Sequence, residues 1–415
     1  MVFGDKSLRS RLLFIAGALL ISRLLAAIPV PGINTQQLAN FFSGSQFLGF
    51  LDIFSGGGLS HFSIVMLGVG PYITSSIIMQ LLTMMIPKLK AMYQEEGELG
   101  RKRFTQYSRL ITVPIALVQG FGYLVLLEKS GIISNLSSLD VIVNLVVITG
   151  GAMLMMWLGE IMTEFGIGNG TSLLIFAGIV SRIPSALSQM SLQFTAAQIP
   201  TYLILLVSSL VVIYAVVFIT EAERPIPITY AKRIRGSKVY GGISTYLPLR
   251  VNQAGVIPII FGMSILLIPQ MLFKFIEQIS TNEAVKSVSG VLNNIISNSW
   301  VYAISYFVLV FLFTYFYTAV TFDPDSISKN LQQSGAFIPG VRPGQPTSEY
   351  LGKVLTRITL VGALFLGIIA VLPLVANSIT GISSVAVGGT ALLIVVSVVI
   401  DLIKKIEAQI TMREY

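Results

Sequence analysis

Residues 55–82 read SGGGLSHFSIVMLGVGPYITSSIIMQLL, and this stretch decides the fold that the sequence predicts. It opens with three consecutive glycines, carries a Gly-x-Gly-Pro break inside an otherwise apolar helix, and places small hydroxyl side chains beside that break. A spanning helix that touched only lipid would lack such interruptions, because each one frees backbone polar groups that hydrocarbon cannot satisfy. We therefore expect this helix to face protein or water.

The whole chain has the composition of an integral membrane protein. Of its 415 residues, 54% are hydrophobic and 11% are charged, whereas soluble proteins carry about a quarter charged residues. Ten apolar runs approach the roughly 20 residues that cross a bilayer as a helix, and they predict an all-α polytopic membrane protein with ten transmembrane helices. The expected spans lie at about 12–28, 62–86, 106–127, 141–162, 172–187, 199–220, 253–275, 300–321, 355–375 and 385–403.

The distribution of basic residues predicts the orientation of the spans. When the ends of alternate spans are taken as cytosolic, 22 of the 27 Lys and Arg residues lie on that side. By the positive-inside rule, both termini are expected in the cytosol. The first apolar run lacks a cleavage site of small residues, so we expect it to remain as the first span.

Two blocks of five spans, 1–190 and 191–415, are expected to form two halves. An odd number of spans in each block places the halves in opposite orientations, as in transporters with inverted repeats. A secondary transporter is therefore the alternative function, and it would require a charged or carbonyl-lined solute site at mid-membrane depth. The sequence instead places aliphatic residues there and adds two large cytosolic loops.

Several kinds of chemistry have no residues to support them. The chain has no cysteine and one histidine, which excludes thiolate catalysis and a metal site built from cysteines or several histidines. Gly166, Gly168 and Gly170 do not follow a strand of a βαβ unit, so they do not indicate a phosphate-binding loop. We expect no enzymatic activity, no cofactor and no bound metal.

Several motifs resemble those of the SecY family, the channel subunits of the bacterial protein translocon. They are GVGPYITSSIIMQLL at 68–82, GIGNG at 166–170, FIPGVRPG at 337–344 and the tail IEAQITMREY at 406–415, in the same order as in the family. The resemblance covers nearly the whole chain. It implies a channel in the bacterial plasma membrane with a central hourglass pore. It also implies partners: the small subunits SecE and SecG, the motor ATPase SecA, the ribosome, preprotein signal sequences and membrane lipids.

A short apolar segment at about 47–59 follows the first span and is too short to cross the membrane. From the residues alone, an interfacial loop with a few anchoring aromatics explains it equally well. The resemblance implies the plug, a short helix in the external mouth of the closed pore, with a glycine hinge. The plug residues would be Phe50, Leu51, Ile53, Phe54, Gly56, Gly57 and Gly58.

The resemblance also implies a ring of aliphatic residues that seals the pore at mid-depth. Two pairs within this set are spaced four residues apart, so each pair shares a helix face. The alternative is that they are ordinary core aliphatics. The family prefers an aliphatic residue where this chain has a threonine, whose hydroxyl we expect to bond a backbone carbonyl of the preceding turn. The ring residues are Val69, Ile73, Thr171, Ile175, Ile260 and Ile394.

Four polar residues match the family's contact between the second, third and seventh spans, where the channel opens sideways to lipid. Hydrogen bonds between helices in a membrane contribute only about 0.6 kcal/mol on average, so the contact is suited to opening. Simple helix packing is the alternative for Gln119. The four residues are Thr74, Ser75, Gln119 and Asn252.

Two cytosolic loops, 221–252 and 323–354, are expected to dock partners. The first interleaves basic residues with tyrosines, and this favours a surface for an anionic partner. In the second, Arg342 lies between two Pro-Gly pairs, and the resemblance implies that it contacts the motor and the ribosome; the alternative is that it caps a turn of its own chain. The docking residues are Lys232, Arg233, Arg235, Lys238 and Arg342.

Overall fold

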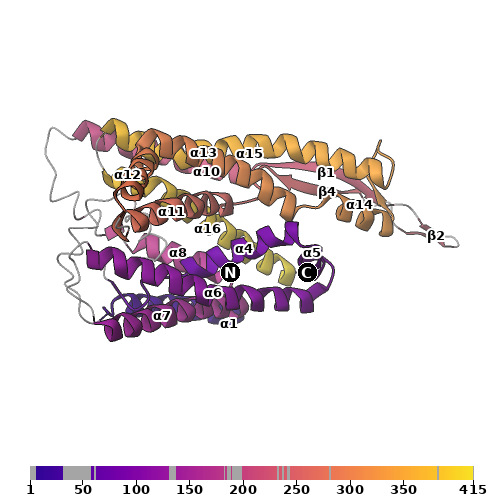
Figure 1. The fold of residues 1–415 in the computed structure, drawn as a ribbon. Helices are drawn as coiled ribbons and strands as arrows, with labels where there is room; N and C mark the ends of the chain where they lie inside the picture. Colours follow the sequence, from indigo (N-terminus) through magenta and orange to yellow (C-terminus); the bar gives the residue numbers. More distant parts are fainter. Residues whose placement is uncertain are drawn as a thin grey trace. The chain divides into compact units, whose positions relative to one another are not determined.

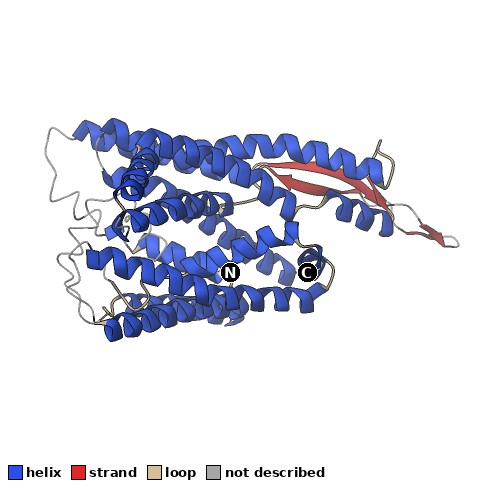
Figure 2. Cartoon of the chain, in the orientation of Figure 1, coloured by secondary structure: helices blue, strands red, loops and turns tan. Residues whose placement is uncertain are grey.

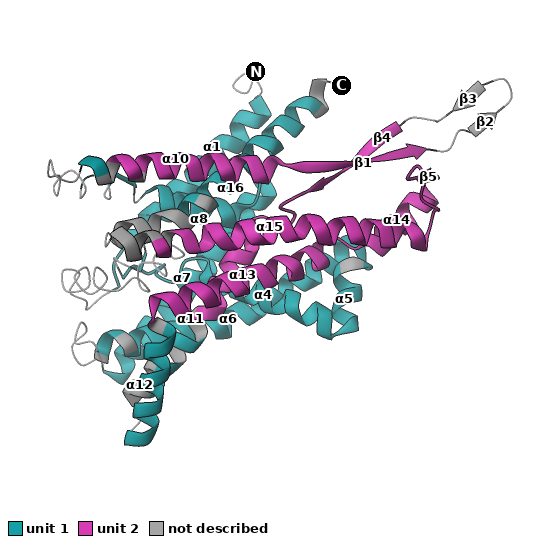
Figure 3. Cartoon of the chain, turned by 90° about the horizontal axis from the view of Figure 1, so that it is seen from above, with its two compact units in different colours: residues 1–200, 267–297, 380–415 teal, residues 201–266, 298–379 magenta. Residues whose placement is uncertain are grey.

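The fold is mostly helical (Figures 1 and 2). The structure is a computed structural model, and it describes residues 6–30, 58–59, 62–129, 137–181, 183–184, 188, 199–230, 233–235, 238–240, 244–279, 282–380 and 383–414. Its contacts divide the chain into two compact units (Figure 3): unit 1 comprises residues 1–200, 267–297 and 380–415, and unit 2 comprises residues 201–266 and 298–379. The consecutive halves 1–190 and 191–415 stay a prediction.

Unit 1 is built from helices. Helix α4 packs along α6, α7 packs against α1, α6 and α8, and α8 also contacts α16. The bounds are α1 Lys6–Ala26, α4 Gly70–Met85, α5 Pro87–Gln94, α6 Gly97–Lys129, α7 Ser138–Phe165, α8 Gly170–Val180, α12 Glu283–Ser297 and α16 Ser383–Glu414.

Unit 2 combines long helices with a small sheet. Helix α11, Ile257–Ile279, begins in unit 2 and continues into unit 1 after residue 266. The other helices are α10 Ile199–Glu221, α13 Ser299–Thr321, α14 Pro324–Gln333 and α15 Gln345–Thr380, and the strands are β1 Glu223–Tyr230, β2 Arg233–Arg235, β3 Lys238–Tyr240, β4 Ser244–Arg250 and β5 Ala336–Phe337.

Four helical stretches within the described residues are long and apolar enough to cross a membrane. They are Gly97–Val125, Ser138–Phe165, Ser299–Gln333 and Gln345–Leu372, and they contain most of the third, fourth, eighth and ninth expected spans. Helices α4 and α5 pass the same test as a pair, but the chain bends by 116° between them. The described parts of the other expected spans do not meet this test, so the number ten stays a prediction.

The second span differs from its expected form at its start. Residues 62–69 form turns, and the helix begins only at Gly70, with Pro71 in its first turn. Proline suits this position because its ring fixes a helical φ and its missing N–H would have had no partner there. The Gly-x-Gly-Pro sequence therefore starts the helix, and the expectation that it interrupts one is wrong. At the other end, Ile86 is extended before Pro87, as residues preceding proline usually are.

The expectation of an all-α fold is wrong outside the long helices. A three-stranded antiparallel sheet, in the order β4-β1-β5, occupies part of both expected docking loops, and β2 and β3 form a second hairpin. In β1, Ile226 and Ile228 are buried while their neighbours Pro225 and Pro227 are exposed. This alternation has the period of two that is typical of a strand with one covered face.

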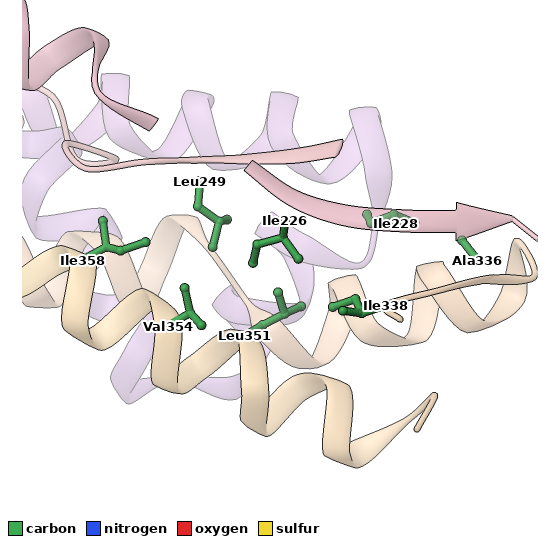
Figure 4. Close-up of a cluster of buried hydrophobic side chains, with 8 residues drawn as sticks. All are labelled: Ile226, Ile228, Leu249, Ala336, Ile338, Leu351, Val354 and Ile358. Carbon is green, nitrogen blue, oxygen red and sulfur yellow. The ribbon is translucent and has the colours of Figure 1, made fainter. Parts of the chain in front are cut away.

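A cluster of aliphatic side chains fills the space between this sheet and α15 (Figure 4). Leu249 of β4 and Leu351 of α15 are fully buried, and partly buried residues of α14 pack at the edge. The cluster ties together both expected docking loops. Its members are Ile226, Ile228, Leu249, Ala336, Ile338, Leu351, Val354 and Ile358, which are named the sheet cluster below.

Candidate functional site

The turns at 62–69 lie deep inside unit 1, although they have no regular secondary structure. Phe62, Val65 and Met66 are at most 1% exposed. Backbone hydrogen bonds tie the segment to the chain after α1: the Val30 N–H donates to the Phe62 carbonyl at 2.9 Å, and the Ile64 N–H donates to the Ile28 carbonyl at 3.0 Å. Non-helical backbone of an apolar segment is thus held by protein partners, as membrane burial requires.

Glycines let this segment approach its neighbours closely. A Cβ atom at Gly151 of α7 would lie 1.9 Å from the Ile64 carbonyl oxygen, and one at Gly58 would lie 2.8 Å from the Ser63 hydroxyl oxygen. Neither position has room for a side chain. Of the expected plug residues, only Gly58 is described; Phe50, Leu51, Ile53, Phe54, Gly56 and Gly57 lie outside the described residues.

Five of the six expected ring residues lie in unit 1. Val69 is the residue before α4, and its carbonyl accepts the N–H of Ile73 at 3.0 Å, so the two occupy successive turns of one helix start. Ile175 of α8 and Ile394 of α16 are 3% exposed, and these two helices are in contact. Ile260 is half-buried on α11 in unit 2. Closure of the six into one ring stays a prediction.

Thr171 differs from its expected role in one respect. Its hydroxyl donates to Oδ1 of Asn169 at 2.6 Å, and not to a backbone carbonyl. Asn169 precedes α8 and also accepts the N–H groups of Thr171 and Ser172, which is the usual way an asparagine caps a helix. The γ-methyl of Thr171 faces Gly159 of α7, where a Cβ would lie 2.8 Å away. This methyl therefore contributes to packing between α7 and α8.

The GIGNG turn meets residues that are distant in the sequence. Gly168 has a φ of +89°, which favours glycine, and a Cβ there would lie 4.0 Å from Nζ of Lys405. Gly166 lies close to Ile15 of α1. The turn has no basic residue of its own, but α16 places a lysine beside it.

The expected polar contact is present in part. The fully buried Ser75 hydroxyl of α4 donates to the Ser108 carbonyl of α6, which links the second and third spans. Thr74 donates to the Gly70 carbonyl of its own helix at 3.1 Å. Gln119 is half-buried on α6, and Asn252 is buried in unit 2. The Oδ1 of Asn252 has no hydrogen-bond partner in the part of the chain that the structure describes.

Unit 1 contains an ion pair that the sequence did not predict. Nε of Arg109, on α6, lies 2.8 Å from Oε1 of Glu160, on α7, and Tyr72 of α4 lies beside the same carboxylate. The pair joins the beginning of the third expected span to the end of the fourth. The sequence does place an arginine and a glutamate at the same expected depth of neighbouring spans. Because they are 51 positions apart, only the fold shows that they pair.

Arg342 lies on an exposed turn whose backbone is held at several points. Gly340 and Gly344 on either side have φ values of +84° and +95°. The Arg342 carbonyl accepts the Thr347 hydroxyl at 2.8 Å, and the neighbouring Val341 packs against the sheet cluster. Arg233, Arg235 and Lys238 belong to the β2–β3 hairpin, and Lys232 lies outside the described residues.

Among the residues that the structure describes, no group of three or more His, Asp or Glu side chains could hold a metal ion. Three further ion pairs between described residues, Lys102–Glu98, Arg103–Glu96 and Lys405–Asp401, join side chains that are at least 44% exposed.

Comparisons with known proteins agree on one family. The family model described as SecY matches residues 63–403. The protein translocase subunit SecY of Mycobacterium tuberculosis is 40% identical over 98% of this chain and 96% of its own length. The SecY subunit of Thermotoga maritima is 42% identical over 100% of this chain and 95% of its own length.

Solved structures share the fold at lower identity. A structure described as a protein-conducting channel has a TM-score of 0.65 and 18% identity, and it covers 95% of this chain and 91% of its own. The canine Sec61 structure from a ribosome–channel complex of the endoplasmic reticulum has a TM-score of 0.61 and 16% identity, with the same coverage.

Proposed function

The chain belongs to the SecY family, and we propose that it forms the protein-conducting channel that moves unfolded preproteins across the bacterial plasma membrane and releases transmembrane segments sideways into it. The observation that carries this proposal is the length of the match. Translocase subunits align with 98–100% of this chain and with 95–97% of their own lengths, so the whole channel is matched and not a single motif. A full-length match to translocase subunits does not favour the alternative function, a secondary transporter.

The closed channel would be sealed by shape and by exclusion of water. We propose that Val69, Ile73, Thr171, Ile175, Ile260 and Ile394 form the constriction and that residues 47–59 cover its external mouth. Hydrophobic constrictions of this kind block ions because water leaves them. The deep turns at 62–69 support the proposal, since they lead into α4 through Val69, which is buried.

Release into lipid would follow from partitioning. A Leu or Ile in a translocating segment gains about 0.3–0.6 kcal/mol by entering the bilayer, while a central Asp, Lys or Arg costs about 2.5–3.5 kcal/mol. A segment of about twenty apolar residues would therefore leave through a side opening between the second and seventh spans. The Ser75 contact with α6 would form one edge of that opening, and Asn252 is proposed for the other.

Partners would supply the energy and complete the complex. We propose that SecE and SecG join in the membrane, and that SecA or a ribosome docks on loops 221–252 and 323–354, with both chain termini in the cytosol. The sheet cluster supports the docking surface because it joins the two loops into one folded piece. Ten spans in two inverted halves remain part of this proposal.

Reconstitution tests the function directly. Vesicles that contain the chain, its two small subunits and SecA should import a preprotein in the presence of ATP, so that the preprotein becomes resistant to added protease. Vesicles without ATP and vesicles without the chain are the controls. A chain that never protects the preprotein, in vesicles where a related SecY does so, would refute the proposal.

The absence of cysteine permits a sharp test of the ring. Ile260→Cys would carry the single thiol of the chain, and we expect it to cross-link to a preprotein stalled during import. Replacing Ile73, Ile175 and Ile260 with glycine should let ions leak through the idle channel, whereas replacing them with leucine should leak far less. Equal conductance of the glycine and leucine variants would show that these residues do not form the seal.

A further inference from the structure

Helix α12, Glu283–Ser297, exposes apolar side chains along one face. Five of them are between 38% and 59% exposed, and at 3.6 residues per turn they fall within an arc of about 120°. The helix of a soluble protein turns such a stripe toward its core. Here the stripe faces outward. It consists of Val285, Val288, Val291, Leu292 and Ile295.

The two other faces of α12 are polar, and they differ in burial. Ser289 is 4% exposed, and Oδ1 of Asn293, one turn later, is buried, so this face lies against protein at these two turns, although Lys286 before them is exposed. Glu283, Ser287 and Asn294 share the third face and are exposed. The helix thus has one face for protein, one for water and one that is apolar and uncovered. Its only charged residues, Glu283 and Lys286, lie in its first turn and a half.

The chain itself places the end of α12 near a membrane boundary. A single residue, Asn298, separates α12 from α13, and its side chain accepts the Trp300 N–H at 3.0 Å and caps the new helix. Helix α13 begins a stretch long and apolar enough to cross the bilayer, and Trp300 is 63% exposed. Exposed tryptophans at the ends of spans concentrate at the membrane–water interface.

We propose that α12 lies flat in the membrane–water interface, on the external side of the membrane that the chain spans. Its apolar face, Val285, Val288, Val291, Leu292 and Ile295, would lie in the lipid. A lipid surface fits these faces, because an interfacial helix has one apolar side toward the acyl chains and a polar side toward water. This contact anchors to the membrane surface the segment that connects α11 to α13. The inference does not depend on channel activity, since its test measures lipid contact alone.

Single cysteines test the contact, since the chain has none of its own. The full complex, with bimane attached at Val288→Cys or Ile295→Cys, is reconstituted into phosphatidylcholine vesicles whose acyl chains carry bromine. We expect strong quenching of both labels by the brominated lipid, because the apolar face should reach about 5–10 Å into the boundary between headgroups and acyl chains. Labels at the matched positions Ser287→Cys and Asn294→Cys should be quenched by external iodide and hardly by bromine.

Two results would overturn the proposal. If iodide quenches all four labels equally, the apolar face lies in water. If neither quencher reaches Val288→Cys and Ile295→Cys, the face is covered by a partner subunit or a second copy of the chain. Val285→Cys and Leu292→Cys repeat the measurement on the same face, so a label that disturbs one position does not decide the outcome.

Discussion

Unit 1 and the sheet cluster of unit 2 differ in how their elements meet. In unit 1, α7 meets its neighbours through glycines: a Cβ at Gly151 would lie 1.9 Å from the Ile64 carbonyl, and Gly170 approaches the Gly159 carbonyl as closely as 2.0 Å by the same measure. In the sheet cluster, contact is made by the large side chains of Ile226, Leu249 and Leu351, which are at most 2% exposed.

The surroundings explain this difference. Lipid tails are as apolar as leucine, so membrane helices gain little by burying aliphatic side chains and instead pack through close backbone approach at small residues. An open sheet with free edges cannot lie in hydrocarbon, so the β4-β1-β5 sheet lies in water, where burial of apolar area stabilises a fold by about 25 cal/mol per Å². The comparison predicts different responses to mutation in the two regions.

The largest effect should come from Leu249→Ala in the sheet cluster. Removing a fully buried leucine costs about 2–5 kcal/mol, because the site loses apolar contacts and keeps a cavity. Hydrogen exchange should accelerate for the amides of β1 and β4 and stay unchanged for α7. Tyr246→Ala, at a 65% exposed position of the same strand, is the control and should have little effect. Faster exchange in α7 would show that the two regions unfold together.

The sequence indicated the helices of this fold better than its sheet. Apolar runs of about twenty residues placed α6, α7, α13 and α15 correctly because helix periodicity and length are local properties. The strands also have a local signal, the alternation of Ile226 with Ile228 and of Leu247 with Leu249. Pro225, Pro227 and Pro248 obscured it, since proline usually argues against a strand. All three lie at exposed positions of the sheet.

The site was predictable only where its contacts are local. Pro339 to Gly344 marked the fixed turn of Arg342. The sequence also predicted that Gly70-Pro71 interrupts a helix, whereas this pair starts one. The turns at 62–69 could not be recognised, because their apolar composition matches that of a helix and their partners, Ile28 and Gly151, are far away in the sequence. The same holds for Lys405 beside Gly168 and for the Arg109–Glu160 pair.

Gly151→Ala should cause the next largest loss of stability, and this loss should be in unit 1. The added methyl must displace the Ile64 carbonyl, and overpacking of this kind costs about 1–3 kcal/mol. Hydrogen exchange should accelerate in α7 and at 62–69 and remain unchanged in β1. A methyl group at the neighbouring Gly150 would meet no atom within 4 Å, so Gly150→Ala is a matched control. It should be neutral or stabilising, because alanine favours a helix by about 1 kcal/mol over glycine.

Ser75→Ala tests whether polar contacts add much to this glycine packing. In this variant the Ser108 carbonyl loses the hydrogen bond from Ser75. It still accepts the Thr112 hydroxyl at 2.8 Å, so it is not left without a partner. We expect a loss of about 0.6 kcal/mol, measured as a small decrease in the thermal unfolding midpoint in detergent. A decrease as large as that of Gly151→Ala would make Ser75 a main support of α4, unsuited to a contact that opens.

Arg342→Glu should have the smallest effect on stability and the clearest effect on function. Its side chain is exposed, and exposed substitutions change stability by less than about 0.5 kcal/mol. The turn itself is held by backbone: Gly340 and Gly344 supply positive φ angles, and the Thr347 hydroxyl bonds the carbonyl of Arg342, which any residue retains. The sheet cluster should therefore hold the turn in place in the variant, and exchange in β1 should be unchanged.

The guanidinium would then be the only group lost from a surface that stays folded. An arginine presents a planar pair of donors to carboxylates and phosphates, whereas lysine keeps the charge and loses this geometry. We expect Arg342→Glu to reduce ATP-driven import into vesicles severely and Arg342→Lys to be intermediate. If Arg342→Glu imports at the rate of the unmodified chain, the turn serves only its own fold. If import falls and the amides of β1 also exchange faster, the arginine stabilises the sheet cluster, and the loss of import follows from the loss of that fold.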